Sequence, residues 1–219
     1  MVLAMDVELV QRAAMHAALG EPIRLAIVDD LVVTDRSPKE LGQRLGLPTN
    51  LLAHHLDVLA NAGLINRGIS SGDQRRRYVQ LQRRDSIRLG VSTPFQAGPM
   101  LFLCSRNSAR SQLAAALWTA RTGKPASSAG TEPAAAVHRR AIVAAKRAGL
   151  DLSAATPRQF DPNESAAQVV TVCDRAHEQL KPLDSWWHWS IGDPAEANTA
   201  AAFNAVVADL DARILSIIS

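Results

Sequence analysis

In the second half of the chain, short strand-like runs, the first of them wholly apolar, alternate with longer stretches in which apolar residues recur at helical spacing. Four runs predict strands, at residues 100–103, 126–129, 168–172 and 187–191. Three stretches predict helices, at residues 111–122, 136–148 and 197–218. A wholly apolar run is typical of a parallel strand buried on both faces. The alternation therefore predicts an α/β domain with a four-stranded parallel sheet covered by helices on both sides.

The first third of the chain shows a helical pattern followed by a hairpin pattern. Helices are predicted at residues 5–19, from 22 onward, at 38–45 and at 49–62. Ser37 is expected to cap the third of these helices, with Glu40 completing a capping box. A short turn at Gly46 joins it to the next helix, which is typical of a helix-turn-helix. Apolar segments at 64–65 and 78–81 flank a polar tip with glycines, so we expect a hairpin. Together these elements predict a mainly α winged helix-turn-helix domain.

The boundary between the two patterns lies at residues 90–99, where Gly, Pro, Ser and Thr gather. A chain of 219 residues with 47% hydrophobic content is long enough for two domains that each bury a core. We expect a first domain at 1–92, a linker at 93–98 and a second domain at 99–219.

Positive charge is concentrated near the end of the first domain, although the net charge is only +3. Seven arginines fall in this stretch, at positions 67, 75, 76, 77, 83, 84 and 88. Such a patch suits the phosphate backbone of nucleic acid. A run of charge is also typical of a solvated face, and both interpretations stay open.

The cellular location of the protein and the redox state of its cysteines are inferred from the length of its apolar runs, its first residues and its cysteine count. No apolar run reaches the ~18 residues of a membrane span. The first residues include Asp6 and Glu8 and predict an amphipathic helix rather than a signal peptide, so we expect a cytoplasmic protein. Two cysteines, Cys104 and Cys173, are too few for a disulfide scaffold. In a reducing compartment the question is whether either thiol is reactive.

The strongest chemical signal is a Cys-x5-Arg pattern between the first strand and first helix of the second domain. Cys104 ends the strand, and Arg110 stands where the helix begins. A helix N-terminus and a nearby arginine favour the nucleophilic thiolate. Backbone N–H groups of the intervening loop can converge on one oxyanion, and Arg110 can bind two of its oxygens. The loop residues are Ser105, Arg106, Asn107, Ser108 and Ala109. A buried structural cysteine beside an unrelated arginine is the alternative.

Such a site also needs an acid to protonate the leaving oxygen. Asp193 follows the fourth predicted strand and precedes Pro194, so it is expected on a loop over the pocket. Asp161 also precedes a proline, but it does not follow a strand, and an Asp-Pro pair by itself is usually a turn.

Residues 8–82 resemble the ArsR/SmtB-type winged-helix repressors. Three segments carry the resemblance: ALGEPIRLAIV at 18–28, ELGQRLGL at 40–47 and HHLDVLANAGLI at 54–65. The resemblance implies a homodimer that places helix 49–62 in the major groove of operator DNA and the wing near the minor groove. The residues implied to lie nearest DNA are Thr49, Asn50, His54, Arg75, Arg76 and Arg77.

One departure from that family concerns metal sensing. Classical members carry a Cys-x-Cys cluster near the helix that here begins close to Glu40, whereas this domain contains no cysteine. Thiolate sensing within it is therefore excluded, and no cluster of histidines and carboxylates suited to a metal is visible. His55 occupies a position often histidine in the family, and a structural role is favoured over a ligand role.

Residues 100–219 resemble the low-molecular-weight phosphotyrosine phosphatase fold, and more closely its arsenate reductase branch. The matching segments are NSARSQ at 107–112, SAGTEP at 128–133, VH at 137–138, DLS at 151–153, VVTVCD at 169–174, HW at 188–189 and DPA at 193–195. Phosphotyrosine-specific members usually carry aromatic residues directly after Asp-Pro. Here Ala195, Glu196 and Ala197 follow, so an aryl group has less to stack on.

The resemblance implies a role for each matching residue. Cys104 attacks arsenate and forms a thiol-bound arsenic adduct, while Arg110 and the loop amides hold the oxyanion. Asn107 braces the loop, Ser111 donates a hydrogen bond to the thiolate, and Asp193 is the acid. Arg106 replaces a small residue, and it either clashes with the pocket or adds positive charge.

A second departure concerns the electron donor. Thioredoxin-coupled members use three cysteines, and Cys173 matches the second, whereas the third position is Leu180. Either a small external thiol such as mycothiol or glutathione attacks the adduct, or Cys173 closes a disulfide with Cys104. A thioredoxin- or glutaredoxin-type protein would then reduce that disulfide. A buried structural thiol is the alternative role for Cys173. No bound cofactor is expected.

The sequence therefore predicts a DNA-binding regulator fused to a thiol-dependent arsenate reductase. Two alternatives remain. One is a repressor whose second domain senses an oxyanion or a redox state without turnover. The other is a low-molecular-weight protein tyrosine phosphatase with a docking domain.

Overall fold

The computed structural model describes residues 7–82, 95–164, 166, 168–182 and 184–218. Packing divides the chain into two units, one of Met1–Ile69 with Arg77–Thr93 and one of Ser70–Arg76 with Pro94–Ser219. None of the described helices is long and apolar enough to cross a membrane.

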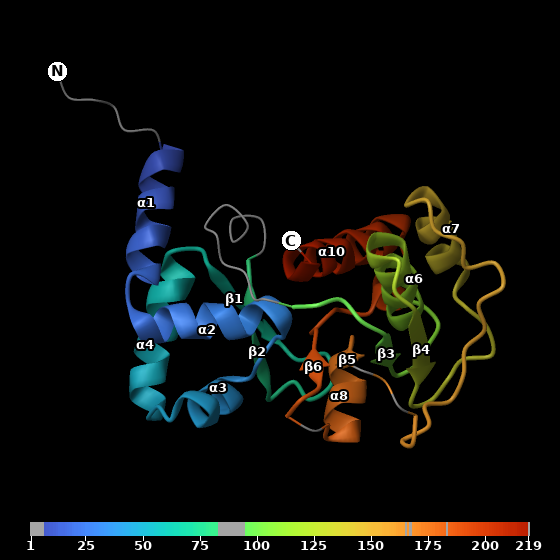
Figure 1. The fold of residues 1–219 in the computed structure, drawn as a ribbon, viewed down its shortest axis with the longest axis horizontal. Helices are drawn as coiled ribbons and strands as arrows, with labels where there is room; N and C mark the ends of the chain where they lie inside the picture. Colours follow the sequence, from blue (N-terminus) through green and yellow to red (C-terminus); the bar gives the residue numbers. More distant parts are fainter. Residues whose placement is uncertain (1–6, 83–94, 165, 167, 183, 219) are drawn as a thin grey trace. The chain divides into compact units, whose positions relative to one another are not determined.

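The first unit contains helices and a two-stranded antiparallel hairpin (Figure 1). Its elements are α1 (Val7–Leu19), α2 (Pro22–Val33), α3 (Pro38–Leu45), α4 (Thr49–Asn61), β1 (Ile65–Ile69) and β2 (Arg77–Leu81). The predicted bounds of α3 are confirmed, and its N-terminus carries the predicted capping box between Ser37 and Glu40. Gly46 ends α3 with a φ of 64°, a left-handed conformation that glycine adopts without strain. The winged helix-turn-helix interpretation stays a prediction.

The hydrophobic core of the first unit is formed by residues of the four helices α1, α2, α3 and α4 and of the hairpin. Its larger members are fully or almost fully buried: Ile27, Val28, Leu31, Leu41, Leu56, Leu59, Leu64 and Val79. His55 is buried beside this core, with Nδ1 at 3.5 Å from a carboxylate oxygen of Glu21. Its structural role stays a prediction, because neither ring nitrogen makes a hydrogen bond among the described residues.

The second unit holds a four-stranded sheet with the order β4-β3-β5-β6. Its elements are β3 (Met100–Cys104), α6 (Arg110–Thr122), β4 (Ala126–Gly130), α7 (Arg139–Arg147), β5 (Gln168–Thr171), α8 (Asp174–Leu180), β6 (Trp187–His188), α9 (Pro194–Ala197) and α10 (Ala200–Ile218). Each neighbouring pair is parallel, as predicted. Helices α6, α7 and α10 lie on one side of the sheet and α8 on the other (Figure 1).

The central strand β3 is buried along its whole length, as the apolar run predicts. Leu101 and Leu103 face a cluster with Phe160 and the end of α8. Phe102 faces the other side and packs against Trp118 and Trp189. With both faces covered, β3 is a rigid base for the residues that follow it.

Four expectations for this unit need correction. Helix α7 begins at Arg139 rather than 136, because His138 caps it and accepts from the Arg140 N–H. The long closing helix α10 begins at Ala200 and not at residue 197. The residues before it form a separate short helix, α9, which Asn198 ends in a left-handed conformation with a φ of 45°. Strand β6 pairs through only two residues, Trp187 and His188. Helix α8 was not predicted, since its sequence lacks an apolar period.

Candidate active site

The thiol of Cys104 sits at the end of β3, where the chain turns into α6. The residue is 2% exposed. Its sulfur lies 3.0 Å from Ser111 Oγ and accepts a hydrogen bond from the Asn107 N–H at 3.1 Å. The Ser111 hydroxyl can also donate to the sulfur, so two polar groups of the loop and helix meet the thiol. The contact with Ser111 has the geometry that the resemblance implies.

Asn107 holds the loop in shape through its side chain. Its φ is 46°, and its amide nitrogen donates to Ser111 Oγ at 2.8 Å and to Ser128 Oγ at 2.9 Å. Its amide oxygen accepts from the Arg158 N–H at 2.9 Å. The left-handed conformation is one that asparagine tolerates better than most residues, and these hydrogen bonds fix it. The geometry agrees with the bracing role expected from the sequence.

The loop also requires a glycine opposite it. A Cβ atom placed on Gly130, the last residue of β4, would lie 2.7 Å from the Ser105 carbonyl oxygen and 3.0 Å from Asn107. No ordinary side chain fits at these distances. The close approach explains the glycine in the SAGT segment and shows how β4 supports the loop from its neighbouring position in the sheet.

Several backbone N–H groups of the loop are available to an anion. Within the described part of the chain, the N–H groups of Arg106, Ser108 and Ala109 find no acceptor. The Ser105 N–H is different, because it donates to the sulfur of Cys173 at 3.3 Å. The Arg106 side chain is exposed, so it does not clash with the pocket and adds positive charge outside it.

Arg110 joins the loop to the expected acid. Its side chain is 6% exposed, with Nη1 donating to the Ile191 carbonyl at 2.9 Å and Nη2 to Asp193 Oδ2 at 2.8 Å. Asp193 also caps α9 by accepting from the Ala195 N–H. Asp161, the competing Asp-Pro aspartate, lies in an exposed turn where it accepts from the Asn163 N–H. The tertiary structure thus brings Asp193, and not Asp161, to the Cys-x5-Arg loop.

The thiol of Cys173 also contacts the oxyanion loop. Cys173 is fully buried and caps α8, where its sulfur accepts from the Ala176 N–H at 3.4 Å. Burial raises the pKa of Cys173 above its usual value, and this outweighs the lowering effect of Arg110. Cys173 therefore stays a neutral thiol near neutral pH. Leu180, at the position of the expected third thiol, is partly buried against the Leu101–Leu103 side of the sheet.

A buried His–Asp pair next to Cys173 was missed by the sequence reasoning. Asp174 Oδ1 lies 3.1 Å from His188 Nε2, and both side chains are almost fully buried. Burial acts to raise the pKa of Asp174, but hydrogen bonds from His188 and from the Ser71 N–H outweigh it and lower the pKa to about 2. No spacing along the chain signals the pair, because Asp174 follows the predicted strand 168–172 whereas His188 lies near the start of the predicted strand 187–191.

The residues expected to contact DNA are exposed. Thr49, Asn50 and His54 are on the surface of α4, and Arg77 is on the surface of β2. Thr49 and Arg77 share a groove of about 670 Å³, which Asn50 and His54 do not line. Its other lining residues are Pro38, Lys39, Gly42, Gln43, Leu47, Leu52, Ala53, Leu56 and Arg67.

The remaining arginines of the basic stretch differ in their surroundings. Arg75 and Arg76 belong to the exposed loop of the second unit, where each lies within 4.0 Å of Asp73. The arginines at 83, 84 and 88 lie outside the described residues. Across the portion of the chain that is described, no group of three or more His, Cys, Asp or Glu residues could hold a metal ion.

Comparisons with known proteins identify the family to which the second unit is similar. A family model described as low molecular weight phosphotyrosine protein phosphatase matches residues 99–218. A search of the curated proteins found no match.

Solved structures of similar fold cover the second unit. The tyrosine phosphatase AmsI of Erwinia amylovora aligns with 17% identity and a TM-score of 0.50, over 57% of this chain and 94% of its own. A low molecular weight protein tyrosine phosphatase from T. tengcongensis aligns with 18% identity and a TM-score of 0.51, over 56% of this chain and 98% of its own. An arsenate reductase in a phosphate-binding state aligns with 23% identity and a TM-score of 0.46, over 54% of this chain and 95% of its own. At these identities the first two likenesses show the fold of the unit.

Proposed function

This chain belongs to the low molecular weight phosphotyrosine protein phosphatase family, and we propose that its second unit is a thiol-dependent arsenate reductase. The observation that carries the proposal is the convergence of Cys104, Arg110 and Asp193 around one loop. Arg110 donates to Asp193 at 2.8 Å, and the Cys104 sulfur accepts from the Asn107 N–H of the same loop. That combination suits attack on a tetrahedral oxyanion.

The reaction begins with attack of the Cys104 sulfur on arsenic. A sulfur–arsenic bond forms, one arsenic–oxygen bond breaks, and Asp193 gives its proton to the departing oxygen, which leaves as water. The loop N–H groups and Arg110 hold the remaining oxygens. The Ser111 hydroxyl, at 3.0 Å, stabilises the thiolate before attack.

The pair between Arg110 and Asp193 sets a condition on this step. In the structure Arg110 Nη2 donates to Asp193 Oδ2, whereas a general acid must carry a proton when the leaving oxygen departs. Arg110 has to turn from Asp193 to the oxyanion before that step. Oxyanion binding therefore competes with the internal ion pair.

Arsenate is favoured over an aryl phosphate by the residues that follow Asp193. Helix α9 presents Ala195, Glu196 and Ala197 at this point, and none of them offers an aromatic face. A small inorganic oxyanion does not need such a face. An aryl phosphate remains the alternative substrate, because the loop chemistry is the same for phosphorus.

The arsenic adduct needs electrons from a thiol. In one route a small external thiol attacks the adduct. In the other, Cys173 closes a disulfide with Cys104, and a thioredoxin- or glutaredoxin-type protein reduces it. The Cys104 sulfur accepts a hydrogen bond from the Asn107 N–H, and the Cys173 sulfur accepts one from the Ser105 N–H. Both thiols therefore contact the same short loop, which supports the second route. The raised pKa of Cys173 opposes it, because the neutral thiol is a poor nucleophile.

Parallel assays of turnover test the enzymatic proposal. Arsenate-dependent oxidation of a thiol should be measured with mycothiol, glutathione and a thioredoxin system, beside hydrolysis of p-nitrophenyl phosphate. Arsenate-dependent thiol oxidation that disappears in Cys104→Ser supports a reductase. Hydrolysis with no thiol requirement would identify a phosphatase. Neither activity, together with oxyanion binding, would favour the sensing alternative.

We propose a second function for the first unit, binding of operator DNA as a homodimer. The exposed polar face of α4 supports it, together with a groove whose lining contains Lys39, Arg67 and Arg77 and no acidic residue. DNA phosphates would meet these cations, and α4 would reach base edges.

The salt dependence of DNA affinity tests the DNA-binding proposal, including the arginines of the 70–76 loop. Neutralising Arg75, Arg76 and Arg77 should lower affinity and reduce the log–log salt slope, by roughly one unit for each phosphate that the protein no longer neutralises. An unchanged slope would show that these arginines stay off the backbone. Sedimentation of the free chain tests the homodimer.

A further inference from the structure

A basic groove outside the Cys104 pocket has no part in the chemistry described above. It has a volume of about 500 Å³ and lies along α7 and the start of α10. Its lining consists of His138, Arg139, Arg140, Val143, Arg147, Asn198 and Ala200. These residues include three arginines and one histidine but no carboxylate. We call this site the α7 groove.

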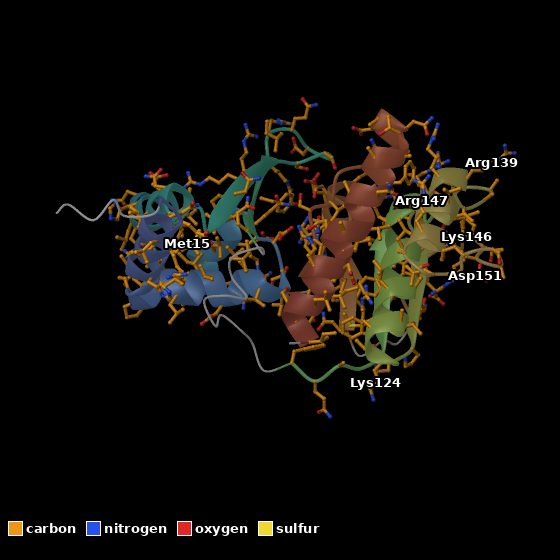
Figure 2. All side chains as sticks on the ribbon, turned by 90° about the horizontal axis from the view of Figure 1, so that it is seen from above. Met15, Lys124, Arg139, Lys146, Arg147 and Asp151 are labelled. Carbon is orange, nitrogen blue, oxygen red and sulfur yellow. The ribbon has the colours of Figure 1, made fainter. Side chains whose placement is uncertain are left out.

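The arginines of the α7 groove have no carboxylate partner among the described residues. Among the residues that the structure describes, Arg139 and Arg147 have no ion-pair partner, and Arg140 donates only to the neutral amide of Asn198 at 3.1 Å. Both Arg139 and Arg147 are exposed. Figure 2 shows them projecting from α7 together with Lys146, well apart from Lys124 on the same unit.

The groove borders both loops of the Cys104 site. The His138 N–H donates to the Ser108 carbonyl of the oxyanion loop at 2.8 Å. Asn198, which lines the groove, ends the short helix α9 that Asp193 begins. A molecule seated along α7 therefore has one end beside the loop that carries Cys104.

The volume and the lining of the α7 groove suit a second reactant better than the oxyanion itself. Arg110 and the loop N–H groups already provide for one tetrahedral anion. A space of this size is ordinary for a small organic ligand. Val143 is 49% exposed, so the groove offers an aliphatic contact between its charged ends.

We propose that the α7 groove binds a low-molecular-weight thiol that carries carboxylates, a tripeptide thiol of the glutathione class. Arginine binds carboxylates through paired N–H donors, and Arg139 and Arg147 lie at opposite ends of α7, about 12 Å apart along its axis, so each can bind a different carboxylate. This assignment rests on the proposed reductase function. It selects a charged thiol over a neutral sugar thiol such as mycothiol as the electron donor.

The bound thiol completes the reaction with a balanced transfer of two electrons. Its thiolate attacks the Cys104 sulfur of the arsenic adduct, a sulfur–sulfur bond forms, and the sulfur–arsenic bond breaks with its electron pair on arsenic. Arsenite leaves, reduced from arsenic(V) to arsenic(III). A second thiol then opens the mixed disulfide, which releases the oxidised disulfide and restores the Cys104 thiolate.

A double variant, Arg139→Gln with Arg147→Gln, tests the site kinetically. The KM for glutathione in arsenate-dependent oxidation should rise about tenfold, since two partly exposed charge pairs are removed. The kcat and the KM for dithiothreitol, a neutral thiol, should change less than about twofold, a difference small against the tenfold effect. Lys124→Gln is the matched control, because it removes an exposed cation far from the groove (Figure 2). An equal rise for both thiols, or an equal rise in the control, would overturn the assignment.

Binding of S-methylglutathione, which cannot react, tests the groove without turnover. Calorimetry should detect binding to the wild-type protein and to Cys104→Ser, and its loss in the double variant. Binding that persists in the double variant, or binding of an oligoglutamate peptide with none of S-methylglutathione, would overturn the assignment. If S-methylglutathione binds but no thiol is oxidised by arsenate, the reductase function fails while the site stands.

Discussion

Replacing Asp193 by Asn should weaken turnover and strengthen oxyanion binding at the same time. In the structure, Asp193 accepts from Arg110 Nη2 at 2.8 Å, and the Arg110 side chain is 6% exposed. An asparagine oxygen can still accept this hydrogen bond, but it carries no charge. Arg110 is then held less firmly and turns to the oxyanion more easily.

The size of the effect follows from the loss of one charge-assisted hydrogen bond. Hydrogen bonds to charged groups contribute about 1 kcal/mol more than neutral ones, so affinity for inorganic phosphate should rise about fivefold. Loss of the general acid should lower kcat by roughly 10² to 10⁴. An ordinary structural defect would instead weaken binding and turnover together.

Calorimetric titration with phosphate, beside turnover of arsenate and of p-nitrophenyl phosphate, measures both effects. Asp161→Asn is the matched control, because this aspartate also precedes a proline but only stabilises an exposed turn. It should change neither quantity. Unchanged or weaker phosphate binding in Asp193→Asn would refute competition between Asp193 and the oxyanion for Arg110. Unchanged turnover would refute the role of Asp193 as the acid.

Three further substitutions test the site and its support. Cys104→Ser should abolish turnover but leave the melting temperature nearly unchanged, which thermal unfolding beside the activity assay would show; substantial residual turnover would exclude Cys104 as nucleophile. Asn107→Ala should lower the free energy of unfolding by about 3 kcal/mol, because several hydrogen bonds are removed and alanine disfavours the left-handed conformation; a change below about 1 kcal/mol would show that the loop holds its shape without this brace. Asp174→Asn should cost about 2 kcal/mol near neutral pH, since the pKa of Asp174 is lowered from 3.8 to about 2 in the folded chain. That stability is present above the unfolded pKa and is lost as pH falls through about 2, so urea unfolding of wild type and variant should converge in acid; a difference that persists there would point to packing instead of charge.

Local spacing predicted most of the secondary structure of this protein. The apolar run before Cys104 became the buried strand β3, and Ser37 and Glu40 formed their capping box. These features depend on residues within one or two turns, so the local sequence contains the information. Helix α8 could not be predicted in this way. Only its residues Asp174 and Ala176 are buried, so its sequence has no apolar stripe at helical spacing.

Other features depend on how distant segments meet. His188 and Asp174 are paired because β6 lies beside β5, and no spacing along the chain predicts a buried pair. The glycine at 130 is required because β4 lies beside β3 and its end approaches the oxyanion loop.

The local sequence was enough to predict a nucleophile beside an oxyanion loop, because the thiol, the loop and the cation lie within seven consecutive residues, 104–110. Which distant groups join them depends on the fold. It brought Asp193 to Arg110, placed Cys173 against Ser105, and joined His138 at the start of α7 to Ser108 of the same loop. The physical reason is the parallel sheet, which gathers the ends of its strands at one edge, whatever their separation along the chain.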